Sequence, residues 1–313
     1  MAEHDALAAG FSNEQNGSLD YRGIFLPITT PFVDDEVSLD NLERNVQMWL
    51  IAPAAGFVVL GTTGEFPHLT FEEKVAVVGA AVAAAEDKPV IAGTGANSTR
   101  ETIALTQAAA EQGARAVMVG TPYYYHYRPE LKADALYDHF TAVADASPVP
   151  VLLYNFPART GIVLDPDLVA ELAQHPNIAG MKDSSRDLAM FAEYAAAVPD
   201  DFALLIGNAG LLLPALTLGA RGGILALANV APWECHELYD LVRQNRLEEA
   251  AVLQRRLSLV NAKLSRYGIP GIKALLTMLG YFGGEPRRPM LPLSQDELDD
   301  IRATLKEVRM LGC

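Results

Sequence analysis

Short apolar runs recur along the chain at intervals of about 30 residues or less. Each run is brief, mostly uninterrupted and rich in Val, Ile and Leu, which is typical of parallel strands that are covered on both faces. The runs cover residues 23–28, 56–61, 89–95, 114–122, 149–157, 177–184, 202–208 and 222–229. The pattern therefore predicts eight strands of one parallel sheet.

Helical patterns separate these runs, and several begin at a residue suited to cap a helix. Thr70 and Ser98 each precede an apolar-periodic stretch and each has a glutamate three residues later, which is the pattern of a capping box. The other predicted helix starts are Ser38, Pro129, Asp165 and Asp187. Strand–helix units with short connections predict an α/β fold of the (β/α)8 TIM barrel type. An open doubly wound sheet is the alternative, but no GxGxxG follows the first strand.

The chain changes character on either side of this repeating pattern. Residues 1–20 are polar and hold no basic segment followed by an apolar one, so we expect a flexible leader rather than a secretory signal. Residues 21–244 contain the predicted barrel. From residue 245 to residue 313 the pattern is purely helical, which predicts a C-terminal helical extension packed on the barrel or on another subunit.

Charge and composition narrow the classes of function. The chain has 24 Lys and Arg against 39 Asp and Glu, and this net charge of −15 argues against nucleic acid or an anionic membrane as a partner. No apolar run approaches the roughly 20 residues that span a bilayer. Cys235 and Cys313 form no CxxC pair, so we predict neither a disulfide framework nor a thiolate zinc site, and a reducing cytoplasm fits best.

Two common kinds of catalytic centre are not indicated. The six histidines show no ligand spacing such as HxxxH, so no metal site is predicted. His68 and His126 could lie near a strand mouth, where a solvated or structural role is the better interpretation. No GxSxG motif marks a nucleophilic serine.

A lysine ends the sixth apolar run, where Ile178 to Met181 give way to Lys182, Asp183 and two serines. Solvent exposure is the usual explanation for such a lysine. In a barrel of this kind, however, the chemistry lies at the carboxyl ends of the strands, and a lysine there can react with a carbonyl group. The strand period of two places Ile178, Gly180 and Lys182 on one face. If that face is interior, Lys182 points into the barrel mouth, where apolar neighbours favour the uncharged amine.

Other polar residues follow the ends of neighbouring runs. In GTTGE, residues 61–65, backbone N–H groups and threonine hydroxyls could converge on a carboxylate, although an ordinary turn with a solvated Glu65 explains the motif about as well. The fifth run ends in Tyr154, whose hydroxyl can pass protons or can simply be the tip of a core side chain. Arg159 beyond it can clamp a carboxylate. Gly207 could admit a ligand to the backbone, and the aromatic run at 121–125 is more typical of packing or of an interface.

Together these motifs resemble one family, that of dihydrodipicolinate synthase and N-acetylneuraminate lyase, which are class I aldolases. The resemblance runs from about Gly23 to the C-terminal helices. It rests on GTTGE at 61–65, TPYY at 121–124, YNFPARTG at 154–161, GMKDS at 180–184 and GGILALAN at 222–229. It implies a (β/α)8 barrel with a helical C-terminal extension, usually assembled as a homotetramer.

The resemblance also implies a role for each site residue. Lys182 would form a Schiff base with the keto carbon of pyruvate or another 2-oxo acid, and an aldehyde would be the second partner, with no separate cofactor. Tyr154 would be the proton shuttle, and Tyr124 would complete its relay from a neighbouring subunit. Thr62 and Thr63 would bind the pyruvoyl carboxylate and hold the tyrosine. The further expected substrate-binding residues are Arg159, Ser184, Gly207 and Leu225.

The sequence leaves several reactions open. The stretches AQHPNIAGMKDSS, VADASPVPVLLY, GTTGEFPHLT and GIPGIKALLTMLGYFGG look most like 4-hydroxy-2-oxoglutarate aldolases, so we predict cleavage of 4-hydroxy-2-oxoglutarate to pyruvate and glyoxylate. Synthases more often carry KEA than KDS after the lysine, but Arg159 is the arginine that synthases use for the second substrate's carboxylate. The alternatives are dihydrodipicolinate synthase, which condenses pyruvate with aspartate semialdehyde, and a 2-keto-3-deoxy sugar acid aldolase or dehydratase. A non-catalytic barrel that binds a keto acid and regulates a partner is the alternative from another class.

Overall fold

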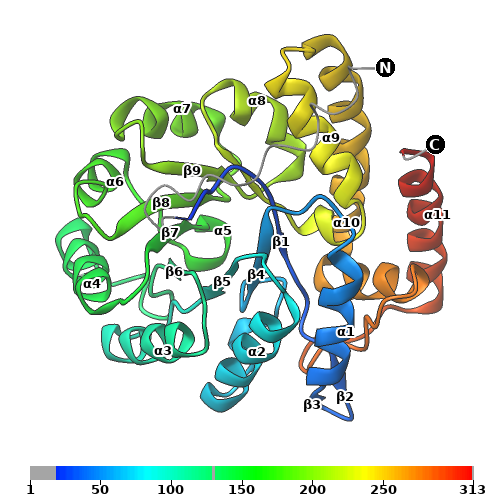
Figure 1. Ribbon diagram of the computed structural model, residues 1–313, viewed down its shortest axis with the longest axis horizontal. Helices are drawn as coiled ribbons and strands as arrows, with labels where there is room; N and C mark the ends of the chain where they lie inside the picture. Colours follow the sequence, from blue (N-terminus) through cyan, green and yellow to red (C-terminus); the bar gives the residue numbers. More distant parts are fainter. Residues whose placement is uncertain (1–18, 129–130, 312–313) are drawn as a thin grey trace, which may run out of the picture.

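Eight parallel strands close into a barrel in the computed structural model, which describes residues 19–128 and 131–311 (Figure 1). Their order is β1-β10-β9-β8-β7-β6-β5-β4, and β1 closes the barrel by pairing with both β10 and β4. The strands are β1 (Gly23–Pro27), β4 (Gly56–Val59), β5 (Val90–Gly93), β6 (Ala116–Gly120), β7 (Val151–Asn155), β8 (Ile178–Asp183), β9 (Ala203–Ile206) and β10 (Gly222–Ile224). Each strand lies inside one of the apolar runs, so the predicted (β/α)8 barrel is confirmed. The predicted leader, residues 1–20, lies outside the described residues except for its last two.

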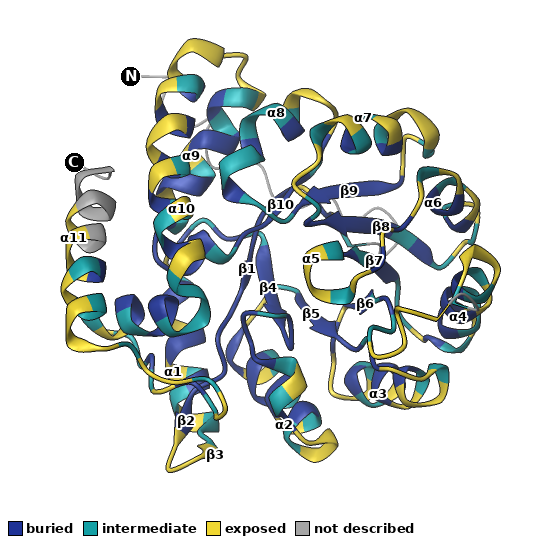
Figure 2. Cartoon of the chain, turned by 180° about the vertical axis from the view of Figure 1, so that it is seen from behind, coloured by how far each residue is buried: buried dark blue, intermediate teal, exposed yellow. Residues whose placement is uncertain are grey.

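The two faces of the strands belong to two separate apolar cores, which is why the runs are apolar throughout. In β1, Phe25 belongs to the cluster inside the barrel, whereas Ile24 and Leu26 belong to the larger cluster between the strands and the helices. Figure 2 shows the barrel strands as buried and the outer faces of the helices as exposed. Burying a side chain of this size contributes about 1.5–3 kcal/mol, so both cores stabilise the closed barrel.

Helices connect the strands and surround the barrel (Figure 1). They are α1 (Leu39–Trp49), α2 (Phe71–Ala84), α3 (Thr99–Glu111), α4 (Ala133–Ala146), α5 (Pro157–Thr160), α6 (Pro166–Leu172), α7 (Leu188–Ala197), α8 (Leu212–Thr217) and α9 (Pro232–Arg243). Short 3-10 helices follow three of the strands: η1 (Phe66–His68), η2 (Ala209–Leu211) and η3 (Ala226–Asn229). A small hairpin, β2 (Phe32–Val33) with β3 (Glu36–Val37), precedes α1. Within the described part of the chain, no helix is long and apolar enough to cross a membrane.

Most of the predicted helix caps are present. Thr70 forms both bonds of the capping box, because its Oγ1 accepts from the Glu73 N–H at 3.2 Å and its own N–H donates to Glu73 Oε2 at 2.8 Å. The side chains of Ser98, Asp165 and Asp187 also accept hydrogen bonds from the first turns of their helices. Ser38 precedes α1 without a side-chain cap bond. Pro129 lies outside the described residues, and the helix predicted there begins as α4 at Ala133.

The predicted C-terminal helices are α10 (Leu247–Met278) and α11 (Gln295–Leu311). The helical path of α10 breaks at Gly268, which has φ 60° and ψ −143°, and Pro270 follows. Glycine is suited to this break because it lacks the Cβ that penalises positive φ. α10 contacts η2 and η3, so it passes close to the carboxyl ends of β9 and β10. α11 packs beside α10 at the edge of the molecule (Figure 1).

Candidate active site

Lys182 lies in the barrel interior near the carboxyl end of β8 and is only 5% exposed. It pairs in register with Tyr154 of β7 on one side and with Leu205 of β9 on the other. Leu205 belongs to the apolar cluster inside the barrel, and Tyr154 packs against that cluster. The Lys182 Nζ lies 4.5 Å from the centre of the Tyr154 ring. Lys182 is therefore a buried amine at a strand mouth and not a lysine that ends its strand in solvent.

The strand leading to Lys182 is less regular than the period of two predicts. Val151 pairs with Ile178 but Leu152 pairs with Gly180, so Ala179 is an extra residue at a shift in register. As a result Ile178 packs in the outer core, whereas Ala179 packs against the interior cluster. The prediction that Ile178 shares a face with Gly180 and Lys182 is therefore wrong. An extra residue of this kind reverses the alternation locally and leaves the rest of the strand in phase.

Two threonines in the turn after β4 lie beside the tyrosine. The hydroxyls of Thr62 and Tyr154 are 3.3 Å apart, which is a hydrogen bond in which either oxygen can donate. Thr63 is buried. Thr62, Thr63, Tyr154 and Lys182 all line one cavity. These hydroxyls and the amine form one polar cluster in an otherwise apolar barrel mouth.

The turn itself is closed by its own backbone. The Gly64 N–H donates to Gly61 O at 3.0 Å and the Glu65 N–H donates to Thr62 O at 3.1 Å. The Thr30 hydroxyl donates to Gly64 O at 2.7 Å from the neighbouring segment. Two of the N–H groups that were expected to bind an anion, those of Gly64 and Glu65, are thus used within the turn.

The cavity above Lys182 has a volume of about 420 Å³ and lies between the barrel mouth and α10. Of the predicted substrate-binding residues, Thr62, Thr63, Arg159, Ser184 and Gly207 line it. Gly207 has a steric reason to be glycine, since a Cβ there would lie 2.0 Å from Ser184 Oγ and 3.0 Å from Lys182 Cε. A side chain at this position would fill the space beside the amine.

The cavity is cationic although the chain is acidic. Its lining includes Lys182 and three arginines, Arg159, Arg186 and Arg266, and no aspartate or glutamate among the described residues. Arg186 and Arg266 were not predicted from the sequence, because neither belongs to a strand-end motif and Arg266 comes from α10. A cavity lined by positive charges without negative ones attracts and orients anionic ligands. The arrangement therefore suits a ligand with more than one carboxylate.

A second, smaller cavity of about 260 Å³ shares Thr62, Tyr154, Phe156 and Arg159 with the first. Its other walls come mainly from β5, β6 and the segments that follow β4 and β6, including Phe66, Met118 and Tyr123. Tyr154 and Thr62 thus belong to the wall that the two cavities share.

Two predicted residues are not brought to the cavity. Leu225 packs in the outer core and its N–H donates to Phe25 O, while its neighbours Ile224 and Ala226 line the cavity. The Leu225 side chain, which directly follows β10, thus packs away from the barrel interior, and its expected part in substrate binding stays a prediction. Tyr124 is 64% exposed and packs edge-to-face on Tyr125. Its role at a neighbouring subunit stays a prediction, since it concerns an assembly of chains.

A buried polar pair on the outer face of the same strands was missed by the sequence analysis. The Asn155 side-chain amide donates to Asp183 Oδ1 at 2.8 Å, and its carbonyl accepts from the Leu164 N–H at 3.1 Å. Burial raises the pKa of Asp183, and hydrogen bonds from Ser185 and Asn155 oppose that rise. The signal in the sequence was the polar residue directly after Tyr154 and directly after Lys182. This pair fixes the ends of β7 and β8, and hence the spacing of the tyrosine and the lysine.

The two histidines that were expected near a strand mouth, His68 and His126, contact other groups of the protein. His68 Nδ1 lies 3.4 Å from Glu65 Oε2, and His126 Nδ1 lies 2.9 Å from Tyr123 O. In the described ranges, no group of three or more His, Cys, Asp or Glu side chains is arranged to hold a metal ion. Both observed environments are those of structural or partly solvated histidines.

Comparison with known proteins places this site in a family context. Residues 20–308 match the model of the dihydrodipicolinate synthetase family. The 4-hydroxy-tetrahydrodipicolinate synthase of Archaeoglobus fulgidus is 37% identical over 93% of this chain and 100% of its own length, and that of Methanothrix thermoacetophila is 39% identical over 92% and 97%.

Among solved structures, dihydrodipicolinate synthase from Bacillus anthracis superposes with a TM-score of 0.88 at 34% identity, covering 92% of this chain and 98% of that chain. The chloride-inhibited enzyme from Acinetobacter baumannii, solved in complex with pyruvate, gives a TM-score of 0.86 at 33% identity, covering 92% and 99%. The predicted likeness to 4-hydroxy-2-oxoglutarate aldolases is not supported, because these relatives are synthases.

Proposed function

The chain belongs to the dihydrodipicolinate synthetase family of class I aldolases, and on that premise we propose that it is a 4-hydroxy-tetrahydrodipicolinate synthase. The proposed reaction condenses pyruvate with aspartate semialdehyde. Enzymes of this family are lyases that use a Schiff-base lysine and no cofactor. The observation that carries the proposal is the buried Lys182 amine in a cationic cavity, beside a tyrosine and a threonine whose hydroxyls are 3.3 Å apart.

In the proposed first half-reaction, the free amine of Lys182 attacks the keto carbon of pyruvate and water leaves, which forms an iminium ion. The positive nitrogen withdraws electrons, so a proton can leave the methyl carbon to give an enamine. Tyr154 is placed to carry these protons because its hydroxyl is hydrogen-bonded to Thr62 and its ring lies next to the amine. The Thr62 and Thr63 hydroxyls would hold the pyruvate carboxylate without adding a fixed charge that competes with the iminium.

In the second half-reaction, the enamine carbon attacks the aldehyde carbon and a new C–C bond forms. The alkoxide takes up a proton. The amino group contributed by aspartate semialdehyde then attacks the iminium carbon, and the bond from that carbon to the Lys182 nitrogen breaks, which closes the ring of the product and frees the lysine amine. Arg159 lies at the rim of the same cavity and can bind the carboxylate of the aldehyde partner through two parallel hydrogen bonds. This position supports an acidic second substrate.

A second candidate function is the 4-hydroxy-2-oxoglutarate aldolase predicted from the sequence. One observation favours it: the described lining of the cavity holds no aspartate or glutamate that would pair with the ammonium of aspartate semialdehyde. Glyoxylate carries a carboxylate and no ammonium, so the three arginines suit it as well. The non-catalytic alternative loses support, because the matched relatives are enzymes.

The two candidates are separated by assaying one preparation of the protein in both reactions. We expect condensation of pyruvate with aspartate semialdehyde to have a kcat/KM at least about tenfold above that for cleavage of 4-hydroxy-2-oxoglutarate, which is a difference of about 1.4 kcal/mol in transition-state binding. The Lys182→Met variant is the control and should lose both activities. Cleavage without condensation would replace the synthase by the aldolase. Assembly as a cytoplasmic homotetramer remains part of the proposal, and measurement of the mass in solution tests the tetramer.

A further inference from the structure

A buried ion pair joins the C-terminal extension to the turn that carries Thr62 and Thr63. Lys273 Nζ of α10 forms an ion pair with Glu65 Oε1 at 2.6 Å, with side-chain exposures of 1% and 0%. Taking two charges out of water is costly, and well-packed apolar residues are often as stabilising as a buried pair. Stability alone therefore explains this pair poorly.

Glu65 is the last residue of the turn and has a left-handed backbone, with φ 59°. Within the turn, its N–H is bonded to Thr62 O. Thr62 and Thr63 line the cavity above Lys182, whereas the Glu65 side chain is buried against Lys273. The turn thus has a side that faces the cavity and a side that is anchored. Because it is short and internally bonded, a shift of Glu65 moves the threonine hydroxyls.

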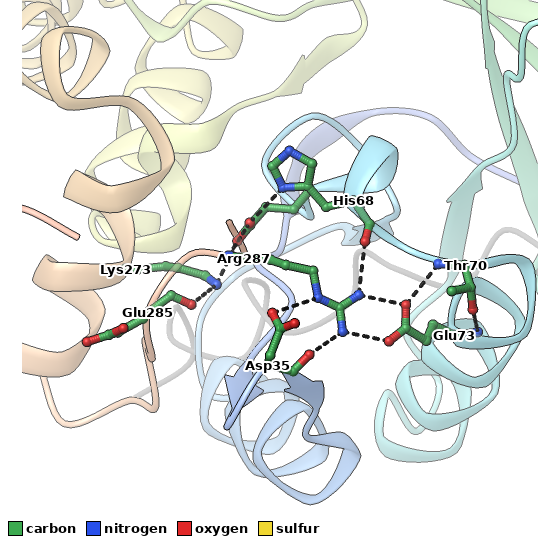
Figure 3. A network of polar contacts seen from close by, with 8 residues as sticks. Asp35, His68, Thr70, Glu73, Lys273, Glu285 and Arg287 are labelled. Carbon is green, nitrogen blue, oxygen red and sulfur yellow. Dashed lines mark hydrogen bonds and ion pairs between the residues drawn. The ribbon is translucent and has the colours of Figure 1, made fainter. Parts of the chain in front are cut away.

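Lys273 is itself held on several sides. Besides Glu65, its ammonium donates to Glu285 O at 2.9 Å (Figure 3). It also lies 4.4 Å from the centre of the Phe32 ring. Burial lowers the pKa of Lys273, and the Glu65 carboxylate opposes this. The residue lies just after the break of α10 at Gly268, and Ile272 beside it lines the cavity. The segment of α10 that borders the cavity therefore also carries the anchor.

Arg287 holds the other carboxylate oxygen. Its backbone N–H donates to Glu65 Oε2 at 2.9 Å, so one oxygen of Glu65 faces Lys273 and the other faces Arg287. The Arg287 guanidinium pairs with both oxygens of Glu73, at 2.6 and 2.7 Å, and donates to His68 O at 2.9 Å (Figure 3). These bonds tie the segment after α10 to the start of α2. A carboxylate held at both oxygens has a fixed orientation.

We propose that Lys273 and Arg287 are positioning residues, which act through Glu65 to hold Thr62 and Thr63 in place for the pyruvate carboxylate. The inference rests on the proposed function, because it assigns the threonine hydroxyls to that carboxylate. It gives the C-terminal extension a task in the reaction although neither residue touches the substrate. Its consequence is that loosening the anchor weakens pyruvate binding even in a protein that is fully folded.

The decisive variant is the double substitution Lys273→Met and Glu65→Gln. Lys273→Met alone takes the lysine partner from the buried Glu65 carboxylate and leaves only the Arg287 N–H and His68 Nδ1 beside it, so it lowers stability and pyruvate binding together. The double variant removes both charges, and the glutamine that replaces Glu65 still offers an amide oxygen to the Arg287 N–H. Lys263→Met is the matched control, since Lys263 is also in α10 and its ion pair with Asp300, at 3.1 Å, joins α10 to α11 and not to the turn.

The probe is pyruvate alone, with borohydride to trap any Schiff base, and mass spectrometry to measure label at Lys182 as the pyruvate concentration rises. We expect the double variant to regain most of the wild-type unfolding temperature, yet to need about 10- to 100-fold more pyruvate for half-maximal labelling. The Lys263→Met control should label like the wild type. If the stable double variant needs no more pyruvate than the wild type, the positioning role is overturned. If the wild type itself gains no label at Lys182, the proposed function fails, and the positioning role with it.

A gentler variant covers the case in which the double variant does not fold. Glu73→Gln weakens the Arg287 guanidinium contacts and keeps the capping box of α2, because glutamine serves in that motif as well as glutamate. We expect it to need about 3- to 10-fold more pyruvate for half-maximal labelling. Labelling identical to the wild type would remove Arg287 from the proposal.

Discussion

Lys182 and Lys273 lie in two regions that look alike at first. They are 5% and 1% exposed, and each Nζ faces an aromatic ring, at 4.5 Å from the centre of Tyr154 and 4.4 Å from that of Phe32. The regions differ in their carboxylates. Lys273 has Glu65 at 2.6 Å, whereas no ion pair of Lys182 is found in the described part of the chain.

This difference separates an amine for chemistry from an amine for structure. Lys273 Nζ is in contact with the Glu65 carboxylate and donates to Glu285 O, so its nitrogen is already occupied. Lys182 has hydroxyls and an open cavity beside it, so a keto acid can reach it. Burial alone therefore does not make a lysine catalytic; the groups that surround it do.

The comparison predicts that one lysine substitution mainly lowers activity and that the matched substitution mainly lowers stability. Lys182→Met should lower kcat/KM by about 10⁴-fold or more, the scale of losing a covalent nucleophile, with little loss of stability because no carboxylate is left unpaired. Lys273→Met should instead lower stability strongly, with a loss of about 3–5 kcal/mol in the free energy of unfolding. Steady-state kinetics and denaturant unfolding of both variants give the measurement. Equal effects of the two substitutions on stability would break the comparison.

Tyr154→Phe tests the proton relay beside Lys182, because it keeps the ring next to Nζ and removes only the hydroxyl. Loss of a general acid–base group lowers turnover by about 10²–10⁴-fold, and we expect that range for kcat. The unfolding free energy should change little, since the bond that the hydroxyl shares with Thr62 is long, at 3.3 Å. An unchanged kcat would remove Tyr154 from the proton relay.

These regions also show how far the sequence could be interpreted. The strands and most helix caps were predicted because apolar runs and capping residues act locally. Lys182 could be placed at a strand mouth for the same reason. The face of Ile178 was wrong because one extra residue, Ala179, shifts the register of β8. The motif at 222–229 did not show that the Leu225 side chain, directly after β10, packs in the outer core.

The anchored side of the GTTGE turn could not be predicted at all. Glu65 was weighed as a solvated residue, but it is buried against Lys273 and Arg287, which are far away in the sequence. No periodicity or cap pattern connects residues that meet only when the barrel closes and α10 packs over it. Arg266 reaches the cavity in the same way.

A third buried basic group, His139, extends the comparison, because no described carboxylate pairs with it and it lines neither of the two cavities above. Burial lowers its pKa from 6.5 to about 4, and Nδ1 is paired with the Thr99 hydroxyl at 2.9 Å. Between pH 6.5 and 4 the unfolded chain therefore binds a proton that the folded chain does not, so stability falls as the pH falls through this window and levels off below it. The difference corresponds to about 3 kcal/mol.

His139→Asn should flatten this part of the stability profile, since asparagine can keep the bond to Thr99 and does not titrate. Denaturant unfolding at several pH values between about 4 and 7 is the measurement. We expect the wild type to lose about 3 kcal/mol more than the variant across the window. Parallel profiles would show that the burial of His139 is not the cause.

The smallest predicted effect concerns the rim of the Lys182 cavity. Arg266→Ala should raise KM for the aldehyde partner about 3- to 10-fold and leave KM for pyruvate unchanged, because an exposed arginine contributes little more than one screened ionic contact. Arg255→Ala, on the exposed side of α10 and outside the cavity lining, is the control. A rise in both KM values would contradict the prediction that Arg266 contacts the aldehyde partner and not pyruvate.

The central claim is that Lys182, and not the equally buried Lys273, reacts with the keto acid. Borohydride reduction in the presence of pyruvate, followed by peptide mapping, locates the reacting lysine. We expect one carboxyethyl group per chain, on the peptide that contains Lys182. Label on Lys273 or another lysine, or a protein without label, would contradict it.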